Sequence, residues 1–422
     1  MTIAPKLRDF DDAEFNPFMS DDLAFGNNDD PYPLLAKLRE ESGGVVAADW
    51  RTTMGLYPDI TQPAEAQRFM ALSAEAVQKV LQTPDVFGNG AYAFNLGRAF
   101  GRSISTMDAP EHGQYRRIFQ KVFLPQYVRE WGGSIVDPVV DDLMQEFQYE
   151  GKADLVQQFT IHYPFRVVYR QLGLPQSEGT IFHKLAIAQT LIAVDTEHAE
   201  EASRKLGEYF KAMIDLKRRE PGEDLLSLLV HTQSEGDYLP DEVLISFFRQ
   251  LLNAAADTTY RGTGVLLTML LSNPDQLEML RNDRSLLPNA IEEALRFDGP
   301  VLVQDRFARV DSDLCGVHIP AGSVVQVVAG AANRDPRLFQ DPDRFDITRP
   351  NAKAHFSFSQ GPHICVGQHL ARVEMTRALT AILDRLHNLR LDPDMPKPVL
   401  RGATLRRSEH LYVRFDPVKR PG

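Results

Sequence analysis

One cysteine of this chain stands in a pattern that suits a metal ligand. Residues 356–372, FSFSQGPHICVGQHLAR, hold Phe358, Gly361, His363, Cys365 and Gly367 in the order F-x-x-G-x-H-x-C-x-G, before a strongly helical continuation. A thiolate at a helix start lies among unpaired backbone N–H groups at the positive end of the helix dipole, which lowers its pKa. The spacing therefore predicts an ionised sulfur that ligates a metal, with two glycines leaving room for a flat ring.

This stretch resembles the haem-binding loop of the cytochrome P-450 superfamily, the haem-thiolate monooxygenases, in its bacterial type. The resemblance implies that Cys365 is the axial ligand of the iron of haem b, where a thiolate favours O–O cleavage. The remaining residues of the pattern would contact the cofactor. Cys315, in DLCGVHIP, lacks such surroundings and is expected to be a packing residue of a strand or turn.

A second stretch, LLNAAADTTYRG, resembles the oxygen-activation motif of the same family. The resemblance makes Thr258 the alcohol that passes protons toward dioxygen with the help of water, and Asp257 the acid that relays protons from solvent. Ala255 occupies the place where the family most often has glycine. We therefore expect a smaller local distortion of the helix here.

Four separated nitrogen-bearing side chains match positions that hold haem propionates in the family. They are His112, Arg116, Arg306 and His363. Bonds from a guanidinium to a carboxylate are charge-assisted and strong. Solvation at the surface is the alternative for any one of them.

A charged cluster with a structural role is also expected. Glu293 and Arg296 stand at i, i+3 in PNAIEEALRFDGP and so share one helix face. They match the E-x-x-R helix of the family, and Arg344 in DPDRFD matches the third member of its charged network. Losing one partner of such a buried network costs ~3–5 kcal/mol.

The resemblance also indicates which segments line a substrate pocket, and these segments are mostly apolar. We therefore expect a mid-sized apolar substrate such as a terpenoid, steroid or aromatic, although pocket and core use the same residue types. The expected lining residues are Phe94, Leu96, Phe100, Leu191, Asn253, Ala254, Val301, Leu302 and Leu405. The segment 51–67 has no assigned role.

The elements that must position these residues are mainly helical. From Pro240 to Asn273 the chain has no internal proline, which predicts a helix of roughly 30 residues and about 45 Å. Further helices are expected at 31–42, 73–83, 111–123, 126–148, 156–172, 177–192, 198–219, 222–233, 274–282, 285–298 and 365–386. Short strands are expected at 45–60, 68–72, 301–309, 313–319, 323–330 and 410–415.

This pattern is mainly α with small β-sheets and lacks regular strand–helix alternation. The resemblance implies one cytochrome P-450 domain over 1–422, and we expect residues 1–25 to be extended. Its long central helix would lie over the haem, with the cysteine loop on the opposite face.

Composition excludes several other classes. The net charge of −12 is spread along the 422 residues, which disfavours nucleic acid as a partner. No apolar run is long enough for a signal peptide or membrane span. Two cysteines fit a reducing compartment. We expect a cytoplasmic monomer.

Three functions are compared. The family implies a monooxygenase, an oxidoreductase that uses dioxygen and electrons from a ferredoxin with its NAD(P)H-dependent reductase. Arg117, Lys121 and Arg372 are candidate contacts for that ferredoxin. The alternatives are a peroxide-dependent peroxygenase and a haem-binding sensor without turnover. A zinc site at His363 and Cys365 lacks further ligands at metal spacing.

Overall fold

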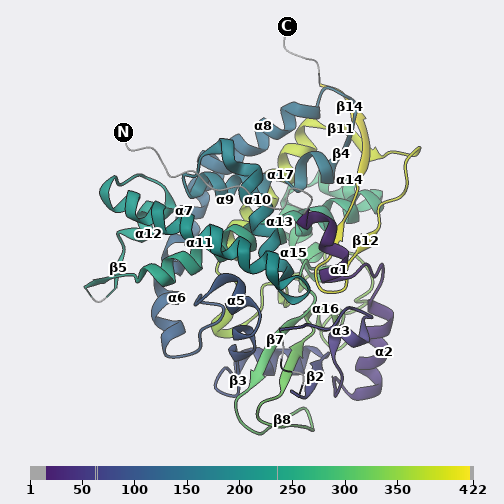
Figure 1. The fold of residues 1–422 in the computed structure, drawn as a ribbon. Helices are drawn as coiled ribbons and strands as arrows, with labels where there is room; N and C mark the ends of the chain where they lie inside the picture. The colour runs from purple at the N-terminus through teal and green to yellow at the C-terminus, as the bar shows by residue number, and fades with distance from the viewer. Residues whose placement is uncertain (1–15, 62, 64, 235, 419–422) are drawn as a thin grey trace.

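The computed structural model describes residues 16–61, 63, 65–234 and 236–418. Helices form most of the molecule, and the largest sheet lies to one side of them (Figure 1). The α-helices are α1 (Asp21–Phe25), α2 (Tyr32–Ser42), α3 (Trp50–Thr53), α4 (Ala74–Gln82), α5 (Leu96–Phe100), α6 (Glu111–Val122), α7 (Pro125–Trp131), α8 (Asp137–Phe147), α9 (Tyr163–Gln171), α10 (Gly179–Thr190), α11 (Thr196–Arg219), α12 (Leu225–Val230), α13 (Asp241–Ser272), α14 (Pro274–Asn282), α15 (Leu287–Phe297), α16 (Ala329–Ala332) and α17 (Gln368–Arg385).

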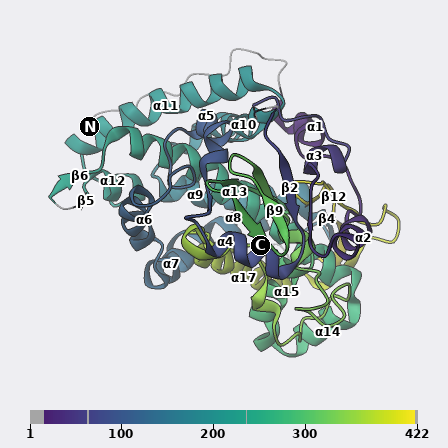
Figure 2. The ribbon, with the colours of Figure 1, turned by 90° about the horizontal axis from the view of Figure 1, so that it is seen from below.

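The long helix α13 is confirmed and lies at the centre of the fold (Figure 1). It starts directly after Pro240 and runs for 32 residues, about 48 Å, because no proline interrupts its hydrogen bonds. Its N-terminal half packs in one large apolar core with α6 and α10–α12, and its C-terminal half packs in another with α8, α15 and α17. Seen from below, α11 and α14 lie along opposite edges of the molecule (Figure 2).

The strands are β1 (Val45–Val46), β2 (Arg68–Ala71), β3 (Phe87–Gly88), β4 (Lys152–Asp154), β5 (Gln233–Ser234), β6 (Asp237–Tyr238), β7 (Gln304–Ala308), β8 (Ser312–Leu314), β9 (Val317–Ile319), β10 (Val324–Val327), β11 (His387–Leu391), β12 (Leu400–Arg401), β13 (Arg407–Ser408) and β14 (Tyr412–Asp416). Five of them form a sheet in the order β1-β2-β10-β7-β3. Only β10 and β2 are parallel in it. Neighbouring residues of β7 point to opposite faces of this sheet, so the side chains of Asp305 and Arg306 lie on different faces.

Three predicted segments differ from the structure. The strand expected at 45–60 ends at Val46, because Asp49 caps the short helix α3 by accepting a hydrogen bond from the Thr52 N–H at 2.8 Å. The segment 313–319 is a hairpin whose turn holds Cys315 at φ 53°, partly buried against a small core. The helix expected at 222–233 is shorter, α12 only.

The N-terminal expectation is wrong where it can be checked. Residues 17–25 form a short 3₁₀ turn, Pro17–Ser20, followed by α1, instead of an extended chain. Residues 1–15 lie outside the described part. Among the helices that the structure describes, none is both long enough and apolar enough to cross a membrane.

Candidate active site

Cys365 lies in the turn between a 3₁₀ segment, Gly361–His363, and α17. Its backbone N–H donates to the Phe358 carbonyl oxygen at 2.8 Å, which fixes the turn. The side chain is exposed, but to an internal cavity of about 290 Å³ instead of the outer surface. The facing wall of this cavity is α13, through Ala254, Ala255 and Thr258. The sulfur therefore points into a space bounded by the central helix.

The predicted lowering of the Cys365 pKa does not hold for the thiol alone. The N–H groups of Gly367 and Gln368 and the charges of Arg116 and Arg372 do lower the pKa. Burial raises it more, so the net shift is upward. The sequence showed the helix start but not the depth of burial, and desolvation is the largest cause.

The two glycines of the loop serve different purposes. A Cβ on Gly367 would meet only the Cys365 sulfur, at 4.0 Å, so this position does leave open space beside the sulfur. Gly361 has φ +69°, and a Cβ there would lie 2.2 Å from the Leu81 carbonyl oxygen. Gly361 is therefore needed for the turn and for close contact with α4.

The structure brings His112, Arg116, Arg306 and His363 together, and His363 lines this cavity. The rings of His112 and His363 have centroids 3.9 Å apart. Burial and the nearby His112, Arg306 and Arg116 lower the pKa of His363 to about 3. The His112 Nε2 atom is buried without a hydrogen-bond partner. Within the described residues, none of the four side chains forms an ion pair with a carboxylate.

These observations fit haem b. A sulfur faces a cavity, Gly367 leaves room beside it, and a cluster of four nitrogen-bearing side chains without an anionic partner borders the cavity through His363. The two propionates of a haem would supply the missing negative charge. No group of three or more His, Cys, Asp or Glu side chains in the described residues could hold a bare metal ion.

Thr258 and Asp257 project from α13 in different directions. The Thr258 hydroxyl donates to the Ala254 carbonyl oxygen at 2.8 Å and lines the cysteine cavity. Helix α13 continues unbroken past this point. The Asp257 carboxylate is buried and accepts from Arg261 Nε at 3.0 Å. Arg261 also donates to Asp21 at 2.9 Å.

Burial raises the pKa of Asp257, while Arg261 lowers it. This carboxylate borders two cavities, one of about 690 Å³ on the side of Thr258 and one of about 770 Å³ between α9, α10 and the C-terminal strands. It is thus the buried acid nearest to Thr258 along the helix, placed between the two spaces.

The 690 Å³ cavity adjoins the cysteine cavity, and both are lined by Ala254, Thr258, Val301 and Gln304. We call it the distal cavity. Of the predicted lining residues, it contains Leu96, Phe100, Asn253, Ala254, Val301 and Leu405. Its lining is less apolar than expected, because carboxylates and guanidiniums from residues 49–68 and β7 also face it.

Three of the predicted lining residues are absent from the distal cavity. Phe94 turns to the outer surface and is 40% exposed. Leu191 packs in a small core with Ala24 and Phe25. Leu302 is fully buried in another core, which includes Met70, Leu72 and Val328. Sequence alone did not show which way each of these side chains would turn.

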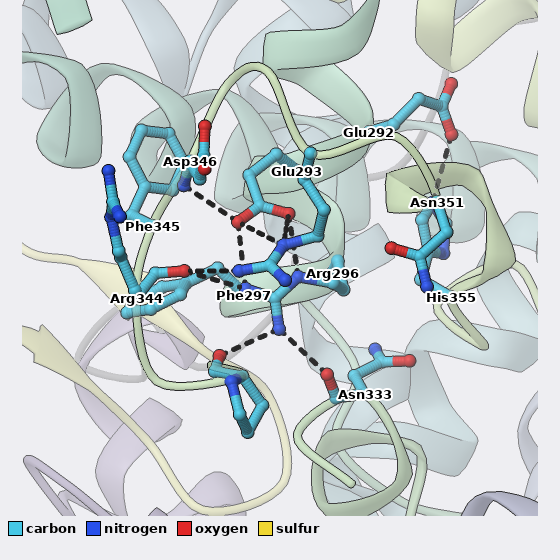
Figure 3. A network of polar contacts seen from close by, with 12 residues as sticks. Glu292, Glu293, Arg296, Phe297, Asn333, Arg344, Phe345, Asp346, Asn351 and His355 are labelled. Atoms are coloured by element: carbon cyan, nitrogen blue, oxygen red, sulfur yellow. Dashed lines mark hydrogen bonds and ion pairs between the residues drawn. The ribbon is translucent and has the colours of Figure 1, made fainter. Parts of the chain in front are cut away.

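The charged network of α15 exists, but its third member is Arg349. Arg296 binds both oxygens of Glu293, at 2.7 and 2.9 Å, and both residues are fully buried. Arg349 Nε donates to the same carboxylate at 3.0 and 3.1 Å. The Arg344 side chain is exposed and points away, and only its carbonyl oxygen takes part (Figure 3). Arg344 and Arg349 are close in sequence, and the turn between them places Arg349, not Arg344, against Glu293.

The candidate ferredoxin contacts divide into two kinds. Arg372 is neutralised by Glu292, at 2.5 and 3.0 Å, and stacks over the Phe358 ring at 4.4 Å. It therefore supports the cysteine turn. Arg117 and Lys121, on α6, are exposed.

Comparisons with known proteins agree with this geometry. The family model "Cytochrome P450" matches residues 174–414. The chain is 35% identical to 6-deoxyerythronolide B hydroxylase of Saccharopolyspora erythraea over 75% of this chain and 79% of that protein. It is 34% identical to vitamin D3 dihydroxylase of Streptomyces griseolus, over 87% of this chain and 92% of that protein.

A solved structure of similar shape is that of CYP109E1 from Bacillus megaterium in complex with testosterone. Its TM-score is 0.79 at 26% identity, and the match covers 92% of this chain and 99% of that one. The likeness therefore extends over the fold as a whole as well as over the cysteine loop.

Proposed function

Because this chain belongs to the cytochrome P450 family, whose members bind haem b through a cysteine thiolate, we propose that it hydroxylates a mid-sized organic substrate held in the distal cavity. The family makes it an oxidoreductase of the monooxygenase class. We further propose a ferredoxin with an NAD(P)H-dependent reductase as its electron source, in the cytoplasm.

One observation carries the proposal: the distal cavity opens onto the cysteine cavity at Thr258 and Val301. A substrate in the distal cavity would thus lie next to the site of oxidation. Two relatives are named for their action on mid-sized molecules, 6-deoxyerythronolide B and vitamin D3. The similar solved structure is a complex with testosterone. A cavity of about 690 Å³ falls in the usual range for a small-molecule site.

Haem b bound by Cys365 would supply the activation of dioxygen. The chain's own residues would then hold the substrate, exclude water and move protons. Arg116, Arg306, His112 and His363 would bind the propionates and fix the ring against α13. Asp257 would take up protons on the side of the 770 Å³ cavity and release them toward Thr258, because its carboxylate borders both cavities and burial raises its pKa.

Thr258→Val tests the proton path. Valine keeps the shape of threonine but removes the hydroxyl that lines both cavities. We expect NADH consumption to continue while product per NADH falls by about tenfold to a hundredfold, with hydrogen peroxide released instead. The measurement is the ratio of product and peroxide to NADH in a reconstituted ferredoxin system.

Thr258→Ser is the matched control, because it retains the hydroxyl, and it should restore most of the coupling. Equal coupling in the valine and serine variants would contradict a role for the hydroxyl. Product formed at the same rate from added peroxide, without NADH and ferredoxin, would support the peroxygenase alternative.

Exposed Arg117 and Lys121 on α6 support ferredoxin docking near the cysteine turn, to which Arg116 of the same helix is hydrogen-bonded through the Ile364 carbonyl at 2.6 Å. Acidic carriers are attracted to such a surface, chiefly through the association rate.

A further inference from the structure

One end of the distal cavity is charged. Three carboxylates, of Asp49, Asp59 and Asp305, and two guanidiniums, of Arg51 and Arg68, line it. The rest of the lining is largely apolar. It includes Trp50, Ile60, Leu96, Phe100, Ile192 and Leu405.

The segment 51–67, without an assigned role in the sequence, helps to form this charged end. Asp49 caps α3 and pairs with Arg68 at 3.3 Å. Asp59 accepts hydrogen bonds from Thr61, with the backbone N–H at 2.9 Å. Farther along, the Ile60 N–H donates to the Ala193 carbonyl oxygen at 3.3 Å and so ties the segment to the turn after α10. Residues 51–60 of the segment therefore form part of the cavity wall, while Tyr57 and Ile60 also reach the outer surface.

Asp305 differs from the other two carboxylates because its side chain has no partner. Its backbone N–H donates to the Tyr92 hydroxyl oxygen at 3.2 Å, and its backbone oxygen accepts from Arg306 at 2.8 Å. The carboxylate itself makes no hydrogen bond or ion pair with any residue that the structure describes. It lies opposite Gln326 of β10, on the sheet face away from Arg306.

The surrounding charges compensate this carboxylate only in part. Arg306 and Arg68 lower its pKa, but burial and two nearby carboxylates outweigh them, and one buried nitrogen of Arg51 has no hydrogen-bond partner among the described residues. Arg68 is engaged by Asp49, and Arg51 donates to the backbone oxygens of Tyr57 and Ala24. Burial and the nearby Asp59 and Asp49 raise the pKa of Asp305 to about 6, so it is mostly ionised at neutral pH. A carboxylate in such a place favours a cation, because an unpaired charge away from water is costly.

We propose that Asp305 binds a positively charged nitrogen of the substrate, which would then be an amine with a large apolar body. This inference rests on the proposed function, because it assigns a substrate class to the same distal cavity. The apolar lining would hold the body, and Thr258 and Val301 would adjoin the carbon that is oxidised. Residues 58–60 would border the ammonium group at the charged end.

Two probes of equal shape test the charge alone: (4-phenylbenzyl)trimethylammonium and 4-neopentylbiphenyl, in which a carbon replaces the nitrogen. The quaternary nitrogen has no lone pair and does not ligate iron. Binding to the purified holoenzyme is measured by the haem absorption shift and by calorimetry, neither of which requires turnover. We expect wild-type protein to prefer the cation, and Asp305→Asn to bind it about tenfold more weakly.

The neutral probe should bind to Asp305→Asn within about twofold of wild type. Asp59→Asn is the matched control inside the cavity, since its carboxylate already serves Thr61, and Asp275→Asn, on exposed α14, is the control for net charge. If Asp59→Asn lost as much affinity for the cationic probe as Asp305→Asn, Asp305 would have no specific role in binding the cation. Wild-type preference for the neutral probe, or binding of neither, would overturn the amine class.

Failure of the proposed function is distinguishable from failure of this inference. If the enzyme hydroxylates neutral substrates but binds the two probes equally, the proposed function stands and the amine inference is wrong. An enzyme that binds the cation through Asp305 but forms no product from any bound amine keeps the binding site and loses the monooxygenase proposal.

The same site predicts a pH dependence. The charged or titratable groups near Asp305 are Asp49, Arg51, Asp59, Arg68, Arg306 and Tyr92. Because the Asp305 pKa is raised to about 6, its charge is present above that pH and lost below it. Affinity for the quaternary probe should therefore fall as the pH drops from about 8 to about 5, while neutral-probe affinity stays constant. The assignment of Asp305 as the ammonium ligand would be contradicted if affinity for the cationic probe did not change with pH, or if it changed equally in Asp305→Asn.

Discussion

Replacing Cys365 with serine is expected to reduce product formation to background. Serine has the size of cysteine, so the turn and its hydrogen bond from the residue 365 N–H to the Phe358 oxygen should persist. The sulfur that faces the cavity is lost, and with it the thiolate that makes this family's haem cleave O–O bonds. The measurement is the absorption band of the reduced carbon-monoxide adduct, together with product formation.

Cys315→Ser is the control for this experiment. Cys315 lies in the β8–β9 turn, partly buried against the core beneath the five-stranded sheet, and has no path to the cysteine cavity. This variant should keep the red-shifted thiolate band and its activity. A thiolate band that survives Cys365→Ser would show that another group ligates the iron, and the site as described would be wrong.

Sequence reasoning was most successful where local pattern determines structure. Helix α13 was predictable because a proline-free apolar run between Pro240 and Pro274 leaves few alternatives. The cysteine turn was predictable because five residues of fixed type stand within ten positions. The nitrogen cluster at the cavity edge followed from the family resemblance, and the structure places all four residues together.

The errors arise where long-range packing decides the result. The Cys365 pKa depends on how deeply the chain buries the sulfur, which no local pattern shows. The pocket residues Val301 and Leu302 are both apolar neighbours, and only the register of the sheet and its contacts turns one inward and the other away. Asp305 was not predicted for the same reason. An aspartate next to Arg306 in sequence suggests an ion pair at the surface, but the two side chains lie on opposite faces of the sheet.

The segment 51–67 was not interpretable because its contacts come from distant parts of the chain. Its position is set by Arg68, by the turn after α10 and by the helix cap at Asp49. A charged loop of this composition is usually solvated, and nothing in its spacing indicates a cavity. Its role became visible only from the side chains that face the same space.

Arg349→Ala is expected to lower the free energy of unfolding of the holoenzyme by ~3–5 kcal/mol. Arg349 donates to the fully buried Glu293 and also to the backbone oxygens of Gln340, Asp341 and Arg344. Its loss leaves Glu293 with one arginine in place of two and leaves three carbonyl oxygens without this donor. The measurement is urea unfolding followed by circular dichroism and by haem release.

Arg344→Ala is the matched control, because it removes the same side chain from the same segment. The Arg344 guanidinium is exposed and points away from Glu293, so Arg344→Ala should change the free energy of unfolding by no more than about 0.5 kcal/mol. The backbone oxygen of residue 344, which accepts from Arg296 and Arg349, is unaffected by the substitution. Equal destabilisation by the two variants would restore Arg344 to the network. A difference of several kcal/mol would show that the turn after Asp341, and not the spacing from the E-x-x-R helix, selects the arginine that holds the core beneath the cysteine turn.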